Sequence, residues 1–506
     1  MAALALLLCG CTVGPDFERP SLWAPGSWFA GRPPARPNAE ASLPVAAPID
    51  PEWWQGFHDP VLTGLVRRAA AGNLDVRAAT ARLAQSRAQR GIAGADQFPQ
   101  VNGNASYTRE RISGKGVSGL FGGGGASAAG TPGTASNGLG GRQGGIPSSS
   151  AIPAFDLFQG GFDAAWELDL WGRVRRSVEA ADASVESSME ARRASLLSTV
   201  AEIARDYIQL RGMQDALRIA RENVRSAQES ANLSEARSRG GLATDLDVSN
   251  ALAQVASTAA TIPQLEQQEA QAINAIGLLL GMPPAALGAE LSPPRPVPPV
   301  PPRVPVGIPS ELARRRPDIR QAEAQLHAAT AQIGMAQADF YPRLTLSGSL
   351  SLQALQLRDL GLPAQTYSLG PSLTIPIFEG GRLRRTVELR DAQQQEAAIA
   401  YQKAVLQAFT EVDNALIAYA AEQRRREQLL IQVQQSRRAL GLARDRYRQG
   451  VADFLQVLTA QRTALAAEQQ ASDSTATVSA NLVALYKALG GGWEADLPDN
   501  LAPRTP

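Results

Sequence analysis

The pattern of apolar and polar positions changes its period along the chain, and the same succession of periods occurs twice. Apolar and alanine positions recur at helical spacing over residues 61–97 and again over residues 310–340. A proline then stops each helix, at Pro99 and at Pro342. The segments after these prolines alternate apolar and polar residues with a period of two, which predicts strands with one apolar face.

The polar faces of these expected strands are rich in carboxylates and hydroxyls. Asp163, Glu167 and Asp169 share the polar face of the strand expected over residues 162–170, and serine and threonine fill the corresponding face of residues 345–351. A half-buried soluble sheet has the same period. Carboxylates on the polar face nevertheless favour a wet lumen, as in transmembrane barrels.

A long helix and a returning helix follow each pair of strands. From Gly172 to residue 239 the chain contains no proline and no further glycine except Gly212, so a single helix would span roughly 100 Å. Glycine then stands in the position that ends a helix. The turns and returning helices are expected at Gly240, Gly241 and residues 244–280 in the first copy, and at Gly450 and residues 453–489 in the second.

Matching residues show that one module is duplicated. Asn73 and Arg316 begin matching segments at an offset of 243 (316 minus 73), whereas Gly172 and Gly381 begin segments at an offset of 209 (381 minus 172). The first copy therefore carries 34 additional residues (243 minus 209), in the Gly- and Ser-rich segment 112–150. No Lys-Ser/Thr pair follows its glycines, so a flexible hairpin loop is favoured over a phosphate-binding loop.

These features divide the chain into a leader, two copies and connecting segments. In order they are a signal peptide over 1–10, a tether over 11–58, repeat 1 over 59–292, a Pro-rich linker over 293–309, repeat 2 over 310–490 and a tail over 491–506. Within the repeats we expect β-hairpins over about 100–171 and 343–378, and helical hairpins over 172–282 and 381–490.

Composition and charge reduce the number of function classes that fit this chain. The net charge of +1 gives no basic footprint for nucleic acid. The two cysteines, Cys9 and Cys11, follow an apolar run and resemble a bacterial lipoprotein signal in which Cys11 carries the lipid; incidental cysteines in a short buried helix are the alternative. No later apolar run reaches the ~18 residues of a membrane helix, so the chain would have to cross a membrane as strands.

Four strands per chain require partners. Single-chain bacterial barrels begin at about eight strands, and open strand edges are not tolerated in lipid. Closure must therefore come from other copies, and the amphipathic helices would form a second tube continuous with the strands. We expect an oligomeric α+β membrane protein with internal duplication.

Motifs over nearly the whole mature chain carry a family resemblance. They are Cys11 with Pro15-Asp16-Phe17, Trp53-Trp54, Asp59-Pro60, Asp96 to Pro99, Trp166 to Gly172, Arg315 to Ile319, Tyr447 with Gly450, and Leu485 to Trp493. With these motifs the chain resembles the outer membrane factors of the TolC and OprM type, and most closely their NodT-like lipoprotein branch in RND efflux.

The resemblance implies a homotrimer whose twelve-stranded β-barrel in the outer membrane continues into an α-helical periplasmic barrel. It also implies contact with outer membrane lipid, a periplasmic adaptor (membrane fusion) protein and an inner-membrane RND-type transporter. Cys11 would carry diacylglycerol and palmitate, and no other cofactor is expected. The duct would export drugs or other small molecules from the periplasm and the pump to the cell exterior.

The resemblance also marks candidate gating residues near the two helical turns. Asp247 lies six residues after Gly241, Leu455 lies five after Gly450, and Tyr447 lies three before Gly450. Asp247 would equally stabilise a helix N-terminus, and Leu455 would equally pack in a helical seam. Where the family often carries carboxylates this chain has Gln456 and Thr459, which weakens the case for a second acidic ring.

No enzyme signature competes with this interpretation. The histidines are His58 and His327, and no zinc spacing, nucleophile elbow or dinucleotide fingerprint occurs. Three other functions stay open at this point: an exit duct of the type I secretion kind, a coiled-coil structural lipoprotein without a pore, and a periplasmic adaptor. The lipid-facing strands favour a duct over a spacer, and the two-copy layout argues against an adaptor.

Overall fold

The computed structural model describes residues 12–21, 25–28, 42–111 and 154–494. The expected signal peptide, the lipidation site Cys11 and the glycine-rich loop lie outside these residues, as does most of the expected C-terminal tail. The chain divides into two compact units. The first comprises Met1–Gly14, Ile92–Ser177 and Gly334–Thr386, and the second comprises Pro15–Gly91, Val178–Ile333 and Val387–Pro506.

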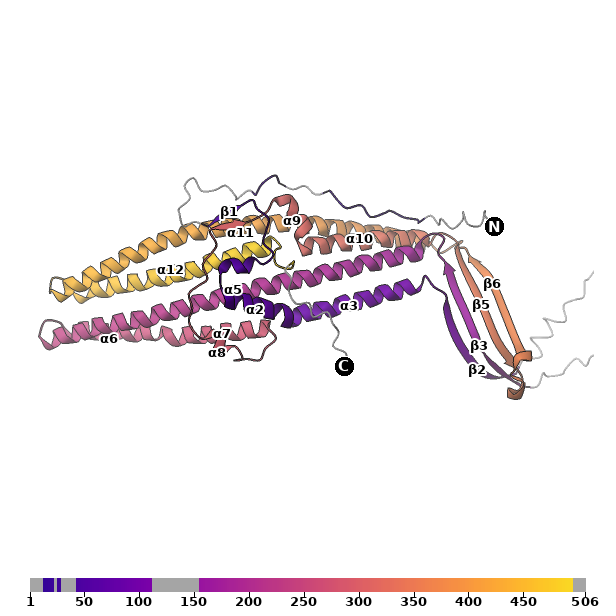
Figure 1. The fold of residues 1–506 in the computed structure, drawn as a ribbon, viewed down its shortest axis with the longest axis horizontal. Coiled ribbons are helices and arrows are strands. Elements are labelled where there is room, and N and C mark those ends of the chain that lie inside the picture. The colour runs from indigo at the N-terminus through magenta and orange to yellow at the C-terminus, as the bar shows by residue number, and fades with distance from the viewer. Residues whose placement is uncertain (1–11, 22–24, 29–41, 112–153, 495–506) are drawn as a thin grey trace, which may run out of the picture. The chain divides into compact units, whose positions relative to one another are not determined.

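The described part of the first unit contains an antiparallel sheet of four strands in the order β2–β3–β5–β6, seen side by side in Figure 1. The strands are β2 (Gln100–Glu110), β3 (Phe155–Leu168), β5 (Arg343–Ala354) and β6 (Gln365–Thr374). Two short 3-10 turns connect β5 to β6, η3 (Leu357–Asp359) and η4 (Leu362–Ala364). β2 and β6 are therefore the edges of this sheet.

The strand register sorts the side chains onto a polar and an apolar face. Neighbouring residues across the four strands form a polar row of Asn102, Asp163, Ser349 and Ser368. The adjacent row, on the opposite face, is Gly103, Phe162, Leu350 and Tyr367. Phe162 is 63% exposed, Tyr367 80% and Leu369 78%, so none of the described residues covers these side chains of the apolar face.

Helices make up most of the rest of the described chain. They are η2 (Trp53–Phe57), α2 (Pro60–Gly72), α3 (Leu74–Ala95), α5 (Arg173–Arg239), α6 (Asp245–Ala259), α7 (Thr261–Leu279), α8 (Gly288–Leu291), α9 (Pro309–Arg315), α10 (Pro317–Ala338), α11 (Arg382–Arg448) and α12 (Phe454–Ala488). A small parallel pair joins β1 (Leu43–Val45) to β4 (Arg303–Pro305). Among the described helices, none is both long and apolar enough to cross a membrane.

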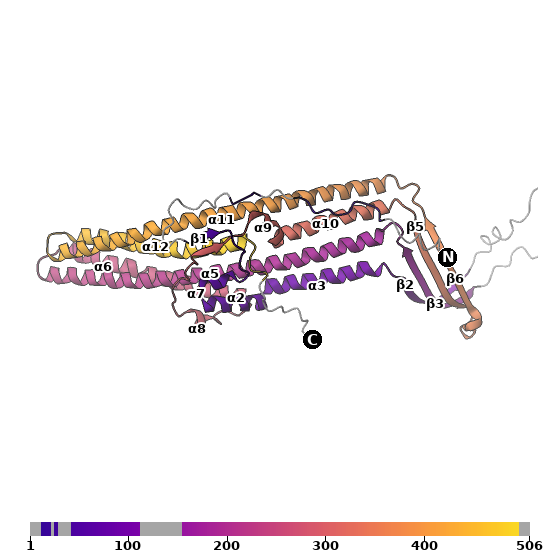
Figure 2. The same ribbon diagram turned by 45° about the horizontal axis from the view of Figure 1, so that its top comes forward.

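The two long helices match in length and register. α5 and α11 each contain 67 residues, and both their first residues (382 minus 173) and their last residues (448 minus 239) are 209 apart. In both views of the ribbon α11 lies beside α12, and α5 lies beside α6 and α7 (Figures 1 and 2). Each copy thus contributes one helical hairpin.

Three helices expected to be continuous are interrupted. Asn73 separates α2 from α3, because its side-chain oxygen accepts hydrogen bonds from the backbone N–H groups of Asp75 (2.9 Å) and Val76 (3.0 Å) and so starts a new helix. Pro317 restricts the residue before it to extended backbone and so separates α9 from α10. α6 and α7 break at Ala260, just before Pro263, which has no N–H to donate; α12 contains no proline and runs unbroken.

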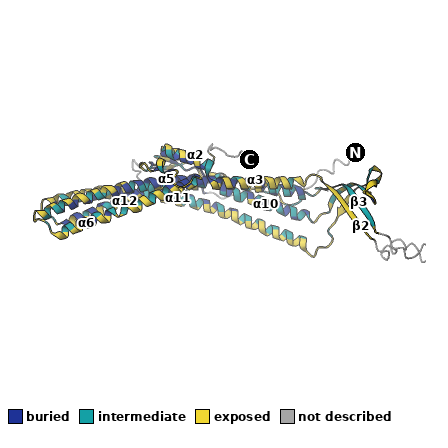
Figure 3. Cartoon of the chain, turned by 90° about the horizontal axis from the view of Figure 1, so that it is seen from below, coloured by how far each residue is buried: buried dark blue, intermediate teal, exposed yellow. Residues whose placement is uncertain are grey.

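The core of the second unit lies where the helical seams meet the segment around η2. Val200, Ile203, Tyr207 and Leu210 on α5 are fully buried; of their counterparts on α11, Val412, Leu416 and Tyr419 are buried and Phe409 is half-buried. In Figure 3 buried residues gather where the α2, α5 and α11 labels meet. Burial raises the pKa of Tyr207 to about 12, and its hydroxyl donates to Asp59 (2.6 Å).

One buried carboxylate stands out in this unit. Glu190 on α5 has no exposed surface and lies between Arg193 (2.5 Å) and Arg320 (2.8 Å). Burial raises the pKa of Glu190 above its ordinary value, although both arginines oppose the shift. One of its oxygens has no hydrogen-bond partner.

Candidate functional site

The two helical turns have the same backbone geometry. Gly241 and Gly450 adopt left-handed φ angles of +70° and +79°, which glycine reaches without strain. In each turn the N–H after the glycine bonds back to the carbonyl five residues earlier, from Leu242 to Arg237 (2.8 Å) and from Val451 to Arg446 (3.0 Å). Both long helices therefore end in a Schellman motif.

Asp247 is engaged at the start of α6. Its carboxylate accepts hydrogen bonds from the backbone N–H (3.1 Å) and hydroxyl (3.0 Å) of Thr244, and its own N–H donates to the Thr244 hydroxyl (3.3 Å). This reciprocal arrangement is a capping box. Asp453 caps α12 in a simpler way, accepting from the N–H of Gln456 (3.1 Å). The structure therefore explains Asp247 as a helix cap, and its gating role stays a prediction.

Leu455 is not packed in a seam of this chain. It is 64% exposed, and its counterpart in the first repeat, Leu246 (455 minus 209), is 68% exposed. Leu242 and Val451, another matched pair, are 69% and 61% exposed. Four apolar side chains are thus uncovered at the turns. From Leu455 the repeat offset of 209 would have led to Leu246 from the sequence alone.

Tyr447 lies inside the contact between the two hairpins. Only 3% of it is exposed, its ring packs edge-on against Phe454 with centroids 5.5 Å apart, and its hydroxyl shares a hydrogen bond with Ser234 (3.2 Å). Ala251, Val457 and Leu458 complete this small core. Tyr447 therefore anchors the second hairpin to the first, whatever role it has in gating.

Arg237 on α5 was not identified from the sequence, yet it connects the two turns. One of its guanidinium nitrogens donates to the carbonyls of Tyr447 (2.7 Å) and Arg448 (3.2 Å), and the other donates to the carbonyl of Leu242 (3.3 Å). The guanidinium also lies 4.7 Å from the centre of the Tyr447 ring. A cation thus satisfies the terminal carbonyls of α11, where the helix dipole is negative.

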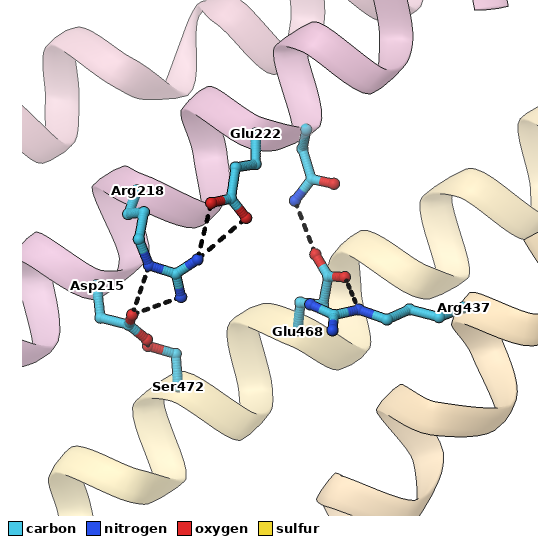
Figure 4. Close-up of polar contacts among 7 residues, drawn as sticks. Asp215, Arg218, Glu222, Arg437, Glu468 and Ser472 are labelled. Atoms are coloured by element: carbon cyan, nitrogen blue, oxygen red, sulfur yellow. Dashed lines mark hydrogen bonds and ion pairs between the residues drawn. The ribbon is translucent and has the colours of Figure 1, made fainter. Parts of the chain in front are cut away.

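Further polar contacts join the hairpins away from the turns (Figure 4). Asp215 on α5 accepts from the Ser472 hydroxyl on α12 (2.6 Å) and is paired with Arg218 (2.6 Å). Glu468 on α12 accepts from Asn223 on α5 (3.1 Å) and from Arg437 on α11 (2.6 Å). The two hairpins of one chain are therefore connected by specific polar bonds as well as by packing.

The three carboxylates expected in a lumen lie in different settings. Asp163 is on the polar face of β3 and accepts from the side-chain amides of Asn102 and Asn104, both at 3.2 Å. Glu167 is on the same face but is paired with Arg173 (2.7 Å). Asp169 was wrongly placed on the strand, because β3 ends at Leu168.

Asp169 instead serves the start of α5. Its carboxylate accepts from the backbone N–H of Arg175 (2.8 Å) and is paired with the side chain of that residue (3.3 Å). An acidic side chain is favourable at this position because the first N–H groups of a helix have no partner within it. Alternating sequence continued through Leu170, so periodicity alone could not show where the strand ended.

Comparison with known proteins decides the class of this molecule. The profile of the family described as "Outer membrane efflux protein" matches residues 65–282 and 308–491. The chain belongs to this family. It is 34% identical to the pyoverdine export outer membrane protein OpmQ of Pseudomonas aeruginosa, covering 98% of this chain and 96% of that one. Nodulation protein T of Rhizobium leguminosarum bv. viciae is 33% identical, with coverage of 99% and 95%.

Solved structures of outer membrane efflux proteins show the same fold. The outer-membrane channel OprN superposes with a TM-score of 0.83 at 35% identity, covering 96% of this chain and 100% of that one. The chain is thus a TolC-like outer membrane efflux channel that extends into the periplasm, and not an enzyme. No cluster of metal-binding side chains occurs among its described residues, and His327 contacts Glu179 (3.1 Å) and stacks on Phe17.

Proposed function

We propose that this efflux channel works as a homotrimeric duct that exports drugs or other small molecules delivered by an inner-membrane RND-type transporter through a periplasmic adaptor. Relatives that match nearly the whole chain are named for pyoverdine export and for toluene efflux. The observation that carries the proposal is the four-stranded sheet with two open edges and one uncovered apolar face.

The sheet supports closure by three copies. Each chain contributes four described strands, and β2 and β6 leave unpaired backbone groups at the two edges. Because unpaired backbone groups are costly in lipid, β2 of one copy would pair with β6 of the next. Three copies then supply twelve strands, which is within the range of bacterial barrels.

The two faces of the sheet fit a membrane outside and water inside. The exposed side chains of Phe162, Leu369 and Tyr367 would face lipid, where an apolar band and interfacial aromatics are favourable. Asp163, with its two asparagine donors, and the hydroxyl pairs Ser349–Ser368 (2.9 Å) and Ser351–Thr366 (2.8 Å) would line the lumen. A wet lumen of this kind suits varied polar and amphipathic cargo.

Anchoring and gating complete the proposal. Cys11 would carry diacylglycerol and palmitate, as the likeness to nodulation protein T and the sequence around Cys11 support. The residues at the turns, Asp247, Leu455 and Tyr447, would form the periplasmic constriction, and the exposed leucines would also offer an apolar surface to the adaptor.

Two measurements test this function. Native mass spectrometry of the detergent-extracted protein should show three copies, and the same preparation should give discrete conductance steps in a planar lipid bilayer. A monomer without conductance would overturn the duct. In cells, deletion should raise the sensitivity to several small toxic compounds, and the intact gene should restore resistance. Unchanged sensitivity throughout would refute drug export while leaving the duct itself in place.

A further inference from the structure

A cavity of about 610 Å³ lies within the second unit of the chain. Its walls come from α5 between Gln214 and Arg225, from Glu269 on α7, and from the segment 292–296 that follows α8. Ligand pockets of proteins commonly have volumes of about 300–1,000 Å³ and combine apolar walls with a few polar groups. The cavity is therefore large enough for a small organic molecule.

Hydrogen bonds hold the three walls of this cavity together. The side-chain amide of Gln214 on α5 donates to the carboxylate of Glu269 on α7 (2.7 Å) and to the carbonyl of Leu291 at the end of α8 (2.8 Å). Arg211, which is fully buried on α5, donates to the carbonyl of Pro293 (3.0 Å). The walls are thus fixed in place before a ligand arrives, and a preformed site has less conformational entropy to lose on binding.

Positive charge exceeds negative charge along the cavity. The two carboxylates that line it are Asp215 and Glu269, and the four arginines that line it are Arg218, Arg221, Arg225 and Arg295. Both carboxylates already accept hydrogen bonds from other side chains of the protein. An anionic ligand would therefore meet cations that the cavity itself does not neutralise.

Two of the four arginines have no partner among the described residues. Arg218 and Arg221 are each paired with a carboxylate, at 2.6 and 2.9 Å, and Figure 4 shows the pair made by Arg218. Arg225 and Arg295 are exposed and make no hydrogen bond or ion pair with another described residue. A guanidinium group matches the geometry of carboxylate and phosphate, which accept two parallel N–H bonds from it.

An apolar surface lines the same cavity as these cations. It consists of Leu217, which is only 5% exposed, together with Pro294 and Pro296. The proline rings present hydrocarbon surface, and proline has no backbone N–H group to donate. This part of the cavity therefore favours a hydrocarbon or aromatic group over a polar one.

The second repeat shows that a long helix forms without these arginines. At the offset of 209, the three arginines of α5 that line the cavity correspond to Glu427, Leu430 and Gln434 on α11. α11 nevertheless has the same length as α5 and the same register. The three arginines thus belong to the first repeat alone, and helix formation does not explain them.

We propose that this cavity binds a small organic anion, whose carboxylate or phosphate group pairs with Arg225 and Arg295 and whose apolar part lies against Leu217 and the two prolines. The site is distinct from the polar face of the sheet and from the helical turns, and each chain carries one copy of it. Salt screens attraction between exposed charges, so the affinity should fall as ionic strength rises.

Isothermal titration calorimetry of the full-length, detergent-extracted protein tests this ligand class with phenyl phosphate, inorganic phosphate and benzyl alcohol. The heat of mixing each probe with detergent micelles alone is subtracted. Phenyl phosphate should bind once per chain, and about tenfold more tightly than either of the other probes, because only phenyl phosphate has both the charge and the ring. Inorganic phosphate or benzyl alcohol binding as tightly as phenyl phosphate would overturn the proposal, and so would the absence of phenyl phosphate binding.

Paired arginine variants then test where phenyl phosphate binds. Arg225→Gln with Arg295→Gln should weaken its binding by about tenfold or more, because two charged donors are lost. Neither side chain has a described contact to lose, so the variant should fold normally. Arg239→Gln with Arg446→Gln is the matched control, because it also removes two exposed arginines without described partners, and it should change the affinity by less than about twofold. Unchanged affinity in the 225/295 variant, or equal weakening in both variants, would overturn the site.

Discussion

Replacing Arg237 with methionine should loosen the end of α11. The substitution removes one short hydrogen bond to the carbonyl of Tyr447 (2.7 Å), two longer ones (3.2 and 3.3 Å) and the stacking on the Tyr447 ring at 4.7 Å. A hydrogen bond from a charged donor contributes about 1.5–3 kcal/mol. A cation–π contact at a partly exposed site adds about 0.5–1 kcal/mol.

The expected loss of stabilising free energy is smaller than the sum of the contributions of all these contacts. Arg237 is half-buried and two of its bonds are long, so we count one full charged bond and the ring contact, about 2–3 kcal/mol in all. Since about 1.4 kcal/mol corresponds to a factor of ten, local opening at the turns should rise roughly thirty- to hundredfold.

Hydrogen exchange followed by mass spectrometry measures this opening directly. Peptides covering the end of α11 and the turn at Gly450 should exchange faster in Arg237→Met, while peptides from the middle of α12 should not change. Arg239→Met is the matched control, because Arg239 is in the same helical turn, is exposed and makes no hydrogen bond or ion pair with another described residue. Equal hydrogen exchange in wild type and Arg237→Met would refute the reasoning. If exchange were faster by the same factor in Arg237→Met and Arg239→Met, the cause would be the loss of a positive charge and not the loss of the hydrogen bonds.

Three other outcomes are expected. Cys11→Ser should abolish labelling with radioactive palmitate and leave the trimer intact; labelling that persists would contradict lipidation at this residue. Leu455→Ala and Asp247→Ala should each raise single-channel conductance, the second also by removing a helix cap that contributes about 1 kcal/mol, and conductance equal to wild type would exclude both from the gate. Burial raises the pKa of Glu190, so the folded protein holds a proton at pH values where the unfolded chain has released it. The stability that this proton contributes is present at low pH. It is lost as the pH rises from the ordinary glutamate pKa through the raised pKa. The melting temperature of Glu190→Gln relative to wild type should therefore rise as the pH is raised above the ordinary glutamate pKa of about 4.3, and a constant difference would refute the assignment.

Sequence periodicity predicted elements but not their ends. Alternation of leucine with serine and threonine located β5, and the absence of proline in residues 172–239 located α5, because both signals are repeated many times along an element. A break depends on one or two residues. Asn73, Pro317 and the end of β3 before Asp169 were missed because capping and proline effects are local and leave the period unchanged.

The candidate site was predicted in position but not in detail. The spacing around Gly241 and Gly450 located the turns, since a helix that ends at glycine has a recognisable sequence. It could not show that Tyr447 is buried against Ser234, or that Arg237 bonds to the other hairpin. Such contacts depend on which helices are neighbours in space, and one period is compatible with several neighbours.

The open edges of the sheet have a consequence for biogenesis. A newly secreted copy carries two strands with one open edge each, and an exposed apolar face, into an aqueous compartment, and such edges are templates for aggregation. Completing this half of the molecule requires a collision between copies, so its rate depends on protein concentration, unlike the helical half with its own buried core. Strong overproduction should therefore favour misassembly, and dependence on periplasmic chaperones should be concentrated in the strands.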